Sequence, residues 1–129
     1  MTILKLLDEA AQLFQKYVKM ESAVDGYCDC YTCGKTYRWQ EMEAGHYIDR
    51  SCKTLVLNPM NVQVQCINCN RFLNGNTEVY RERLVKEYGE ELIADMEAQR
   101  HGRHNWTRQD LKEIIEDLKA AIKEIRGSM

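Results

Sequence analysis

This 129-residue sequence has no long run of apolar residues, which limits where the protein can reside. No stretch approaches the roughly 18 consecutive apolar residues that a membrane-spanning helix needs. The first ten residues also lack the pattern of a secretory signal peptide, and the chain has neither an internal repeat nor a low-complexity tail. We therefore expect a cytosolic protein with no membrane contact, and the length favours a single domain over residues 1–129.

An excess of positive charge is missing as well, because the formal net charge is -2 at pH 7. Taken alone, this value gives no sign of a nucleic-acid partner. Acidic residues nevertheless crowd the two ends of the chain, while basic residues are scattered through its middle. A polyanion needs only a locally positive face. The candidate phosphate contacts are Arg50, Lys53, Arg71, Arg81, Arg83, Arg100 and Arg103, of which Arg81 and Arg83 could equally well be solvated.

Four of the six cysteines form two pairs, Cys30-x2-Cys33 and Cys66-x2-Cys69. Disulfides are rare in the cytosol, so paired cysteines there indicate metal or redox chemistry. Each short pair turns the backbone so that two thiolates face one point, and two such pairs supply the four sulfurs of a tetrahedral Zn²⁺ site. Gly34 directly follows the first pair and suits a tight turn. We therefore predict a structural zinc ion bound by these four cysteines.

The alternative for one pair is a redox role or simple burial. Neither pair begins a helix in a βαβ unit, where a redox motif belongs. Cys28 offers a competing register with Cys33, but the spacing is worse, and Cys52 has no partner at ligand spacing. We expect both to be bystanders. A closed site of four cysteines has no open position for water, so zinc would stabilise the fold and would not catalyse.

Helical and extended patterns predict the local structure. Amphipathic or capped stretches predict four helices, at residues 2–20, 77–88, 90–99 and 107–127. Thr2 is a candidate N-cap for the first helix, and Gly89 ends the second. Thr107, with Asp110 three residues later, suggests a start like a capping box for the last helix. The apolar runs 43–48 and 54–57 are typical of the two strands of a β-hairpin.

A single histidine, His46, lies between the two cysteine pairs. A lone histidine in an apolar strand is usually a hydrogen-bonded structural residue. The order of cysteine pair, strand with His46, Asn61, cysteine pair, Asn70 and helix, however, resembles the HNH endonucleases, also called ββα-metal or His-Me finger nucleases. The resemblance implies that His46 is the general base, that Asn61 orients its loop and that Asn70 binds Mg²⁺ or Mn²⁺. Asn61 could otherwise merely cap a loop.

These residue types suit phosphodiester hydrolysis, which needs a proton acceptor and a cation. An imidazole with an ordinary pKa of ~6.5 accepts a proton at neutral pH. Activity would therefore fall as the pH becomes acidic, with a midpoint at pH ~6–7. An amide oxygen suits a hard ion such as Mg²⁺. Many HNH nucleases place an acidic residue directly before the histidine, where this sequence has Gly45. Glu43 or Asp49 could supply the second metal ligand, or the site could be poor in carboxylates.

A narrower resemblance rests on the segments CYTCG, EAGHYIDR, NVQVQCINCN, NGNTEVYRERLVKEYG and RHNWT. Together they closely resemble the phage NinG family, which includes the lambda recombination endonuclease Rap. The similarity covers the chain from about Phe14 through the last helix. The family implies cleavage of branched recombination DNA, such as Holliday junctions and displacement loops, in the bacterial host of a phage. Two symmetric cuts in a junction would favour a homodimer.

Together these expectations describe an α+β fold. Its centre would be a zinc-stabilised, HNH-like ββα-metal nuclease core over residues 27–89. The N-terminal helix 2–20 and a C-terminal helical region, 90–127, would flank this core. Two other classes stay open: a zinc-ribbon module that binds nucleic acid without cutting it, and a structural adaptor whose end helices pair with other proteins.

Overall fold

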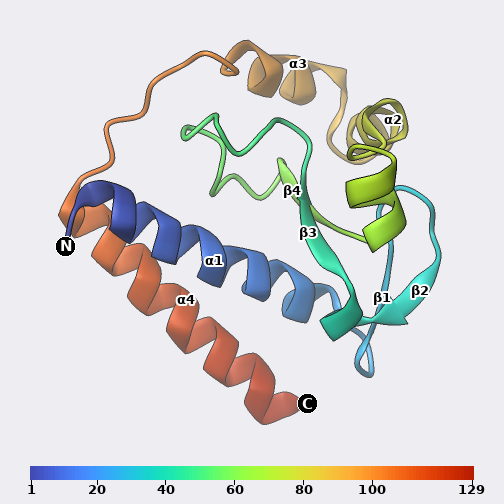
Figure 1. The fold of residues 1–129 in the computed structure, drawn as a ribbon, viewed down its shortest axis with the longest axis horizontal. Coiled ribbons are helices and arrows are strands. Elements are labelled where there is room, and N and C mark those ends of the chain that lie inside the picture. Colours follow the sequence, from blue (N-terminus) through green and yellow to red (C-terminus); the bar gives the residue numbers. More distant parts are fainter.

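The computed structural model describes all residues from 1 to 129, and two long helices form one side of it (Figure 1). Helix α1 spans Ile3–Ser22 and helix α4 spans Arg108–Ser128. They lie side by side and run in the same direction, so the start of α4 is next to the N-terminus (Figure 1). The two ends of the sequence thus form one layer of the fold.

Helix α1 packs through an apolar stripe that includes Leu7, Phe14 and Val18, all of which are buried. These side chains contact Leu111 and Leu118 of α4, with the N-terminal halves of both helices together. The predicted apolar face of α1 is therefore confirmed as part of the core.

Both long helices begin at the predicted caps. Thr2 Oγ1 accepts a hydrogen bond from the backbone N–H of Lys5 (3.2 Å), and Thr107 Oγ1 accepts one from the backbone N–H of Asp110 (3.1 Å). Such contacts satisfy N–H groups that have no partner within the helix. No helix in the structure is long and apolar enough to cross a membrane.

The strand that carries His46 has a different partner from the one predicted. Strand β3, Glu43–His46, pairs antiparallel with β4, Val62–Gln65. The predicted second strand, 54–57, is wrong, because that segment forms turns in the loop between β3 and β4. Its apolar character has another cause: Leu55 and Val56 are both buried, but in two different hydrophobic clusters.

The two faces of the β3–β4 ribbon differ in polarity. Ala44 and Val62 face α1 and α4, where they join Phe14 and Leu118 in one cluster. The pairs Glu43↔Gln65 and Gly45↔Gln63 lie in register, so these four residues share the opposite face because strand side chains alternate. The ribbon therefore has one apolar face toward the helices and one polar face.

The first cysteine pair lies at the turn of a hairpin that sequence reasoning did not predict. Strand β1, Tyr27–Asp29, pairs with β2, Thr36–Arg38, and the short helix η1, Trp39–Glu41, follows. Gly34 has a φ of +79° and donates its N–H to Cys30 O at 2.9 Å. The predicted tight turn after the first pair is confirmed.

The second cysteine pair leads into a π-helical turn, η2, Asn68–Phe72. Helices α2, Thr77–Tyr88, and α3, Glu90–Ala98, follow and pack on each other (Figure 1). They are separated by Gly89, whose φ of +94° allows the chain to turn sharply. Both helices cover the β3–β4 loop through one hydrophobic cluster, which includes Leu55, Leu84 and Ile93.

Candidate metal centre and catalytic surface

The structure brings the four predicted zinc ligands together. The sulfurs of Cys30, Cys33, Cys66 and Cys69 all lie within 4.8 Å of one another. The Cys33 and Cys66 sulfurs are 3.7 Å apart. A tetrahedral site with Zn–S bonds of ~2.3 Å separates its sulfurs by about 3.8 Å. The donor set and its spacing therefore fit a structural Zn²⁺.

The surroundings of these sulfurs differ. Burial raises the pKa of the Cys66 thiol to about 12, so this sulfur would ionise at neutral pH only beside a positive charge. At Cys30, burial raises the pKa, but hydrogen bonds from Thr32 and from backbone N–H groups outweigh it and lower the value to about 6. Cys28 and Cys52 lie outside the cluster. Their thiols instead donate to backbone carbonyl groups, Cys28 to Lys19 O (3.4 Å) and Cys52 to Gln99 O (3.6 Å).

His46 is the last residue of β3, and its side chain lies on the face of the ribbon toward α1. The ring nitrogen Nε2 is buried and has no hydrogen-bond partner in the protein. Burial, followed by the positive charge of Arg50, lowers the pKa of His46 to about 4, while Asp49 opposes the shift. The imidazole is therefore neutral at pH 7, and its environment makes it a weaker base than an ordinary histidine.

Asn61 is fully buried and holds the loop that follows His46. Its Oδ1 accepts a hydrogen bond from the backbone N–H of Ile48 at 2.7 Å. Its Nδ2 donates to Ile48 O (3.0 Å) and to Leu55 O (3.3 Å). Two of these three hydrogen bonds fix the chain two residues beyond His46, and the third holds the loop further on, at Leu55.

Asn70 lies against the opposite face of β3 from His46. A Cβ atom at Gly45 would be 3.1 Å from Asn70 Oδ1, and consecutive residues of a strand point to opposite faces. Asn70 Nδ2 donates to Glu43 Oε1 at 3.0 Å. The structure thus brings Asn70 and Glu43 together but not Asn70 and His46. Asp49 is exposed, and its Oδ1 accepts from the backbone N–H of Ser51 at 2.8 Å.

Arg50 lies between Glu43 and His46, and its charge contributes to lowering the pKa values of both. For Glu43 the hydrogen bond from Arg71 is the larger cause. Two hollows beside α1 share Arg50: one of ≈ 420 Å³ that Glu43 lines, and one of ≈ 140 Å³ that His46 lines. Lys53 also lines the smaller one. Glu43 and His46 therefore line two neighbouring hollows that meet at Arg50.

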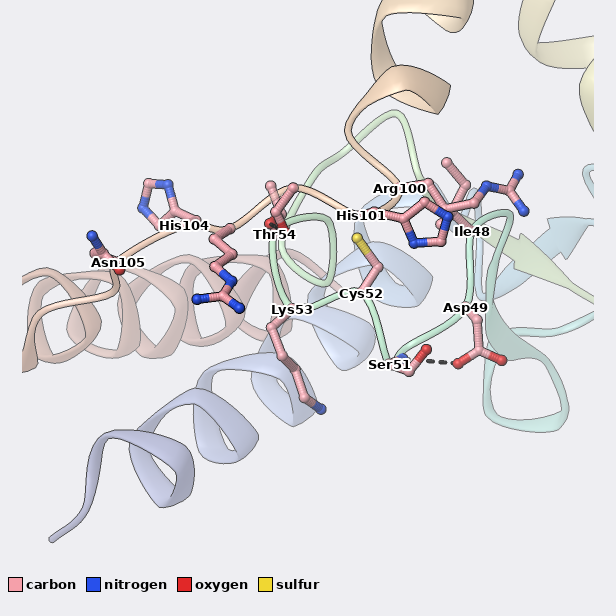
Figure 2. Close-up of a pocket in the computed structure, with 12 residues that line it drawn as sticks. Ile48, Asp49, Ser51, Cys52, Lys53, Thr54, Arg100, His101, His104 and Asn105 are labelled. Carbon is pink, nitrogen blue, oxygen red and sulfur yellow. Dashed lines mark hydrogen bonds between the residues drawn. The ribbon is translucent and has the colours of Figure 1, made fainter.

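A larger groove of ≈ 660 Å³ lies between the loop after β3 and the connector from α3 to α4 (Figure 2). Its two walls are joined by a hydrogen bond from Thr54 Oγ1 to Gly102 O at 2.9 Å. Asp49 is the only acidic side chain in the lining. Its basic and histidine side chains are Lys53, Arg100, His101, Arg103 and His104.

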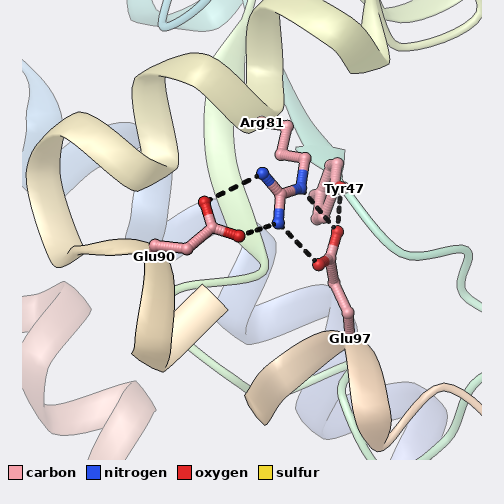
Figure 3. A network of polar contacts seen from close by, with 4 residues as sticks. All are labelled: Tyr47, Arg81, Glu90 and Glu97. Atoms are coloured by element: carbon pink, nitrogen blue, oxygen red, sulfur yellow. Dashed lines mark hydrogen bonds and ion pairs between the residues drawn. The ribbon is translucent and has the colours of Figure 1, made fainter. Parts of the chain in front are cut away.

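Arg81, a predicted DNA contact, is held by two carboxylates within the chain (Figure 3). Its Nε donates to Glu97 Oε2 at 3.0 Å, and its two Nη groups donate to Glu90 at 3.1 and 2.6 Å. The hydroxyl group of Tyr47 donates to the same Glu97. This network links α2, α3 and the β3–β4 loop, so it gives Arg81 a structural role without any nucleic acid.

Two other predicted contacts also have partners within the chain. Arg71 forms an ion pair with Glu43, and its Nε donates to Glu43 Oε1 at 2.9 Å. The guanidinium group of Arg83 lies 5.6 Å from the ring centre of Tyr31. Arg50, Lys53, Arg100 and Arg103 are therefore the predicted bases that line hollows of the surface without a protein carboxylate in contact.

Sequence reasoning missed two buried polar residues of this region, Gln65 and Tyr80. Gln65 Nε2 donates to Gly75 O at 2.9 Å, and the Tyr80 hydroxyl group donates to Gly45 O at 2.7 Å. The alternation in VQVQ could have placed Gln63 and Gln65 on one face of a strand. The three-dimensional position of η2 is needed to show that this face of the strand packs against the turn after the second cysteine pair.

Comparison with known proteins identifies relatives among bacteriophages. A family model described as Bacteriophage Lambda NinG protein matches residues 4–127. The chain is 33% identical over 100 residues to Protein ninG of Escherichia phage lambda. The aligned region covers 77% of this chain and 48% of the phage lambda protein. Protein ninG of Salmonella phage P22 is 31% identical over 100 residues, with the same coverage.

The chain spans about half the length of these curated relatives. No solved structure matches it. The family model, in contrast, covers nearly the whole chain, including both cysteine pairs, His46, Asn61 and Asn70. The chain belongs to the NinG family of bacteriophage proteins.

Proposed function

We propose that this protein is a metal-dependent, structure-specific DNA endonuclease of the HNH type. It hydrolyses phosphodiester bonds in branched recombination intermediates, such as Holliday junctions and displacement loops, in the cytoplasm of a bacterial host. A homodimer would provide the two symmetric cuts that a junction requires. The support comes from one half-buried side chain, His46, and from the basic residues beside it.

The observation that carries the proposal is the unpartnered Nε2 of His46. Buried polar atoms nearly always have a hydrogen-bond partner, and leaving one without a partner costs about 1–3 kcal/mol. Because the imidazole is neutral at pH 7, this nitrogen can take a proton from the water that attacks phosphorus. Asn61 contributes by holding the loop after His46 in one conformation.

The substrate phosphate has cationic partners close to that base. Arg50 and Lys53 line the same ≈ 140 Å³ hollow as His46. Positive groups placed beforehand around a phosphoryl group stabilise the charge that grows on its oxygens in the transition state. The basic groove of Figure 2 begins at Lys53, and Arg100 and Arg103 line it. We assign this groove to the flanking DNA backbone.

We assign Asn70 and Glu43 to a catalytic Mg²⁺ or Mn²⁺, and Asp49, whose charge acts on His46, is the alternative carboxylate. An amide oxygen and a carboxylate are ligands that hard divalent cations prefer. Such an ion, when bound, would neutralise charge on the phosphoryl oxygens. The zinc ion would stay structural, because its four sulfur ligands leave no open position.

The test is cleavage of a four-way DNA junction by the zinc-loaded protein in Mg²⁺. We expect His46→Ala and His46→Gln to lose cleavage by roughly 10²–10⁴-fold, the usual contribution of a general base. Zinc content, melting temperature and junction affinity should stay near the wild-type values. His104→Ala removes an imidazole from the groove and should keep the single-turnover rate at saturating protein. Cleavage by His46→Ala at the wild-type rate would refute the assignment.

The second candidate is a zinc-ribbon module that binds nucleic acid without cutting it. Glu43 accepts hydrogen bonds from both Asn70 and Arg71. This favours the binding module, because a carboxylate whose partners are all within the protein has a structural role. A binding module would hold junction DNA with the wild-type protein and with His46→Ala alike. It would release no cleaved product at any Mg²⁺ or Mn²⁺ concentration.

A further inference from the structure

Helix α1 carries a stripe of amide and basic side chains that the fold does not use. Its members are Gln12, Gln15, Lys16 and Lys19, which we call the α1 stripe. They recur at intervals of three and four residues, so they share one face of the helix. The helix has no acidic residue from position 10 to position 20, although acidic residues are frequent near both ends of the chain. The α1 stripe is therefore positive in a protein of negative net charge.

Two hollows beside α1 meet at the residues that they share, Gln12, Gln15 and Arg50. The smaller hollow contains His46, whose side chain lies on the face of β3 toward α1. The larger one, of ≈ 420 Å³, is lined by α1 from Gln12 to Lys19. A chain of phosphates that has one member beside His46 can therefore continue along this helix.

The larger hollow has the charge that a polyanion requires. Three of its lining side chains are basic, Lys16, Lys19 and Arg50, and Glu43 is the one carboxylate among them. The charge of Glu43 is offset by its ion pair with Arg71. The three basic side chains form no ion pair with any carboxylate of the protein. They are therefore free to contact phosphates.

The far end of the α1 stripe is held in place by Trp39 of η1. The Lys19 Nζ atom lies 5.8 Å from the centre of the Trp39 ring, and both residues line the larger hollow. A cation over an exposed aromatic ring contributes about 0.5–1 kcal/mol. This contact restrains the long lysine side chain before any ligand binds, which lowers the entropy lost on binding.

The opposite side of His46 has its own basic surface. Lys53 lines the smaller hollow together with His46, and it also lines the groove of Figure 2, in which Arg100 and Arg103 lie. The half-buried imidazole therefore has basic residues on two sides. One set comes from α1 and the other from the connector between α3 and α4.

We propose that the α1 stripe binds the DNA strand on one side of the scissile phosphate, while the groove of Figure 2 binds it on the other side. Lys16 and Lys19 contact phosphates, and the glutamine amides donate to phosphate or sugar oxygens. The seven residues from Gln12 to Lys19 extend ~10 Å along the helix axis, which corresponds to about three nucleotides of one strand. The position of these contacts relative to a cut rests on the proposed nuclease function, whereas the contacts themselves do not.

The test measures binding of a four-way DNA junction to the full chain without divalent cations, so that no strand is cut. Phosphates are replaced one at a time by neutral methylphosphonates. We expect the wild-type protein to lose affinity for replacements on both sides of the cleavage position that is found in Mg²⁺. Lys16→Gln should bind more weakly and be insensitive to replacement of its own phosphate partner, because that contact is already lost. Its sensitivity on the other side of the cut should remain.

A salt titration measures the number of contacts. Lys16→Gln and Lys19→Gln together should lower the slope of log affinity against log salt by about two units. Lys123→Gln is the matched control, because it removes the same charge from an exposed position on α4. It should change neither the slope nor the pattern of sensitive phosphates.

The α1 stripe has no role in binding if Lys16→Gln keeps the wild-type sensitivity at every phosphate, or if Lys123→Gln changes binding as much as Lys16→Gln does. Failure of the nuclease assignment has a different signature. The junction would then stay uncut in Mg²⁺, while Lys16→Gln would still lose sensitivity at one group of phosphates.

Discussion

The hydroxyl group of Tyr80 donates a hydrogen bond of 2.7 Å to the backbone carbonyl oxygen of Gly45. Tyr80 is fully buried, and Gly45 is buried as well, so water cannot replace either partner. The bond ties helix α2 to strand β3 at the residue next to His46. The position of the proposed base therefore depends on a helix that contributes no catalytic group.

We predict that Tyr80→Phe destabilises the protein by about 0.5–1.5 kcal/mol, because it removes one buried hydrogen bond to the Gly45 carbonyl group. The free energy of unfolding can be measured by chemical denaturation. Tyr37→Phe is the matched control, because the Tyr37 hydroxyl group has no hydrogen bond within the protein and its loss should change stability little. Equal losses in both variants would contradict the importance of the bond.

We predict that one zinc ion per chain copurifies with the protein, and that Cys66→Ser loses both the zinc and the cooperative unfolding transition. The region around the two cysteine pairs contains only short strands and turns, so metal binding contributes much of its folding free energy. Elemental analysis and thermal melting measure both effects. Cys52→Ser changes a buried thiol outside the cluster and should keep its zinc. A zinc-free, folded wild-type protein would overturn this prediction.

The protein should become less stable as the pH decreases, because His46 must be protonated. Its pKa is about 4 in the folded protein and ~6.5 in an unfolded chain. The unfolded state therefore binds the proton first as the pH falls. The stabilisation is complete above pH ~6.5 and is lost progressively toward pH ~4. Chemical denaturation should show that, between pH ~6.5 and pH ~4, the wild type loses more free energy of unfolding than His46→Gln does. The carboxylates titrate alike in both proteins, so they do not contribute to this difference.

The cleavage rate should respond to pH differently from what the sequence suggests. An imidazole with an ordinary pKa would lose activity near pH ~6–7, whereas burial and Arg50 lower the pKa of His46 to about 4. We therefore expect kcat/KM, which reports groups of the free enzyme, to stay nearly constant from pH 7 to about pH 5. A midpoint at pH 6.5 would show that His46 is more solvated than the structure indicates.

Arg103→Ala should weaken junction binding and lower the slope of log affinity against log salt by about one unit, as expected for one lost phosphate contact. Arg103 lines the basic groove of Figure 2. Arg126→Ala removes the same charge from the exposed end of α4 and should change neither quantity. Equal effects of the two substitutions would show that only net charge matters.

Several features could be predicted because they depend on local spacing. Two residues between paired cysteines bring both sulfurs to one point, whatever surrounds them. Thr2 and Thr107 cap helices through bonds to residues three positions later, and Gly34 turns the chain with a positive φ. These contacts lie within a few residues, so the sequence alone determines them. The four sulfurs and all four helices followed from such patterns.

Other features depended on which distant segments meet. The apolar run 54–57 resembles a strand, but Leu55 and Val56 reach two separate clusters, and Val62–Gln65 takes the place beside β3. Sequence order suggested that His46 and Asn70 meet, whereas strand alternation puts them on opposite faces. Only the packing of η2 against the polar face of the ribbon brings Asn70 to Glu43 and sets Asn70 and Gln65 beside Gly45, because contacts between residues far apart in sequence leave no local pattern.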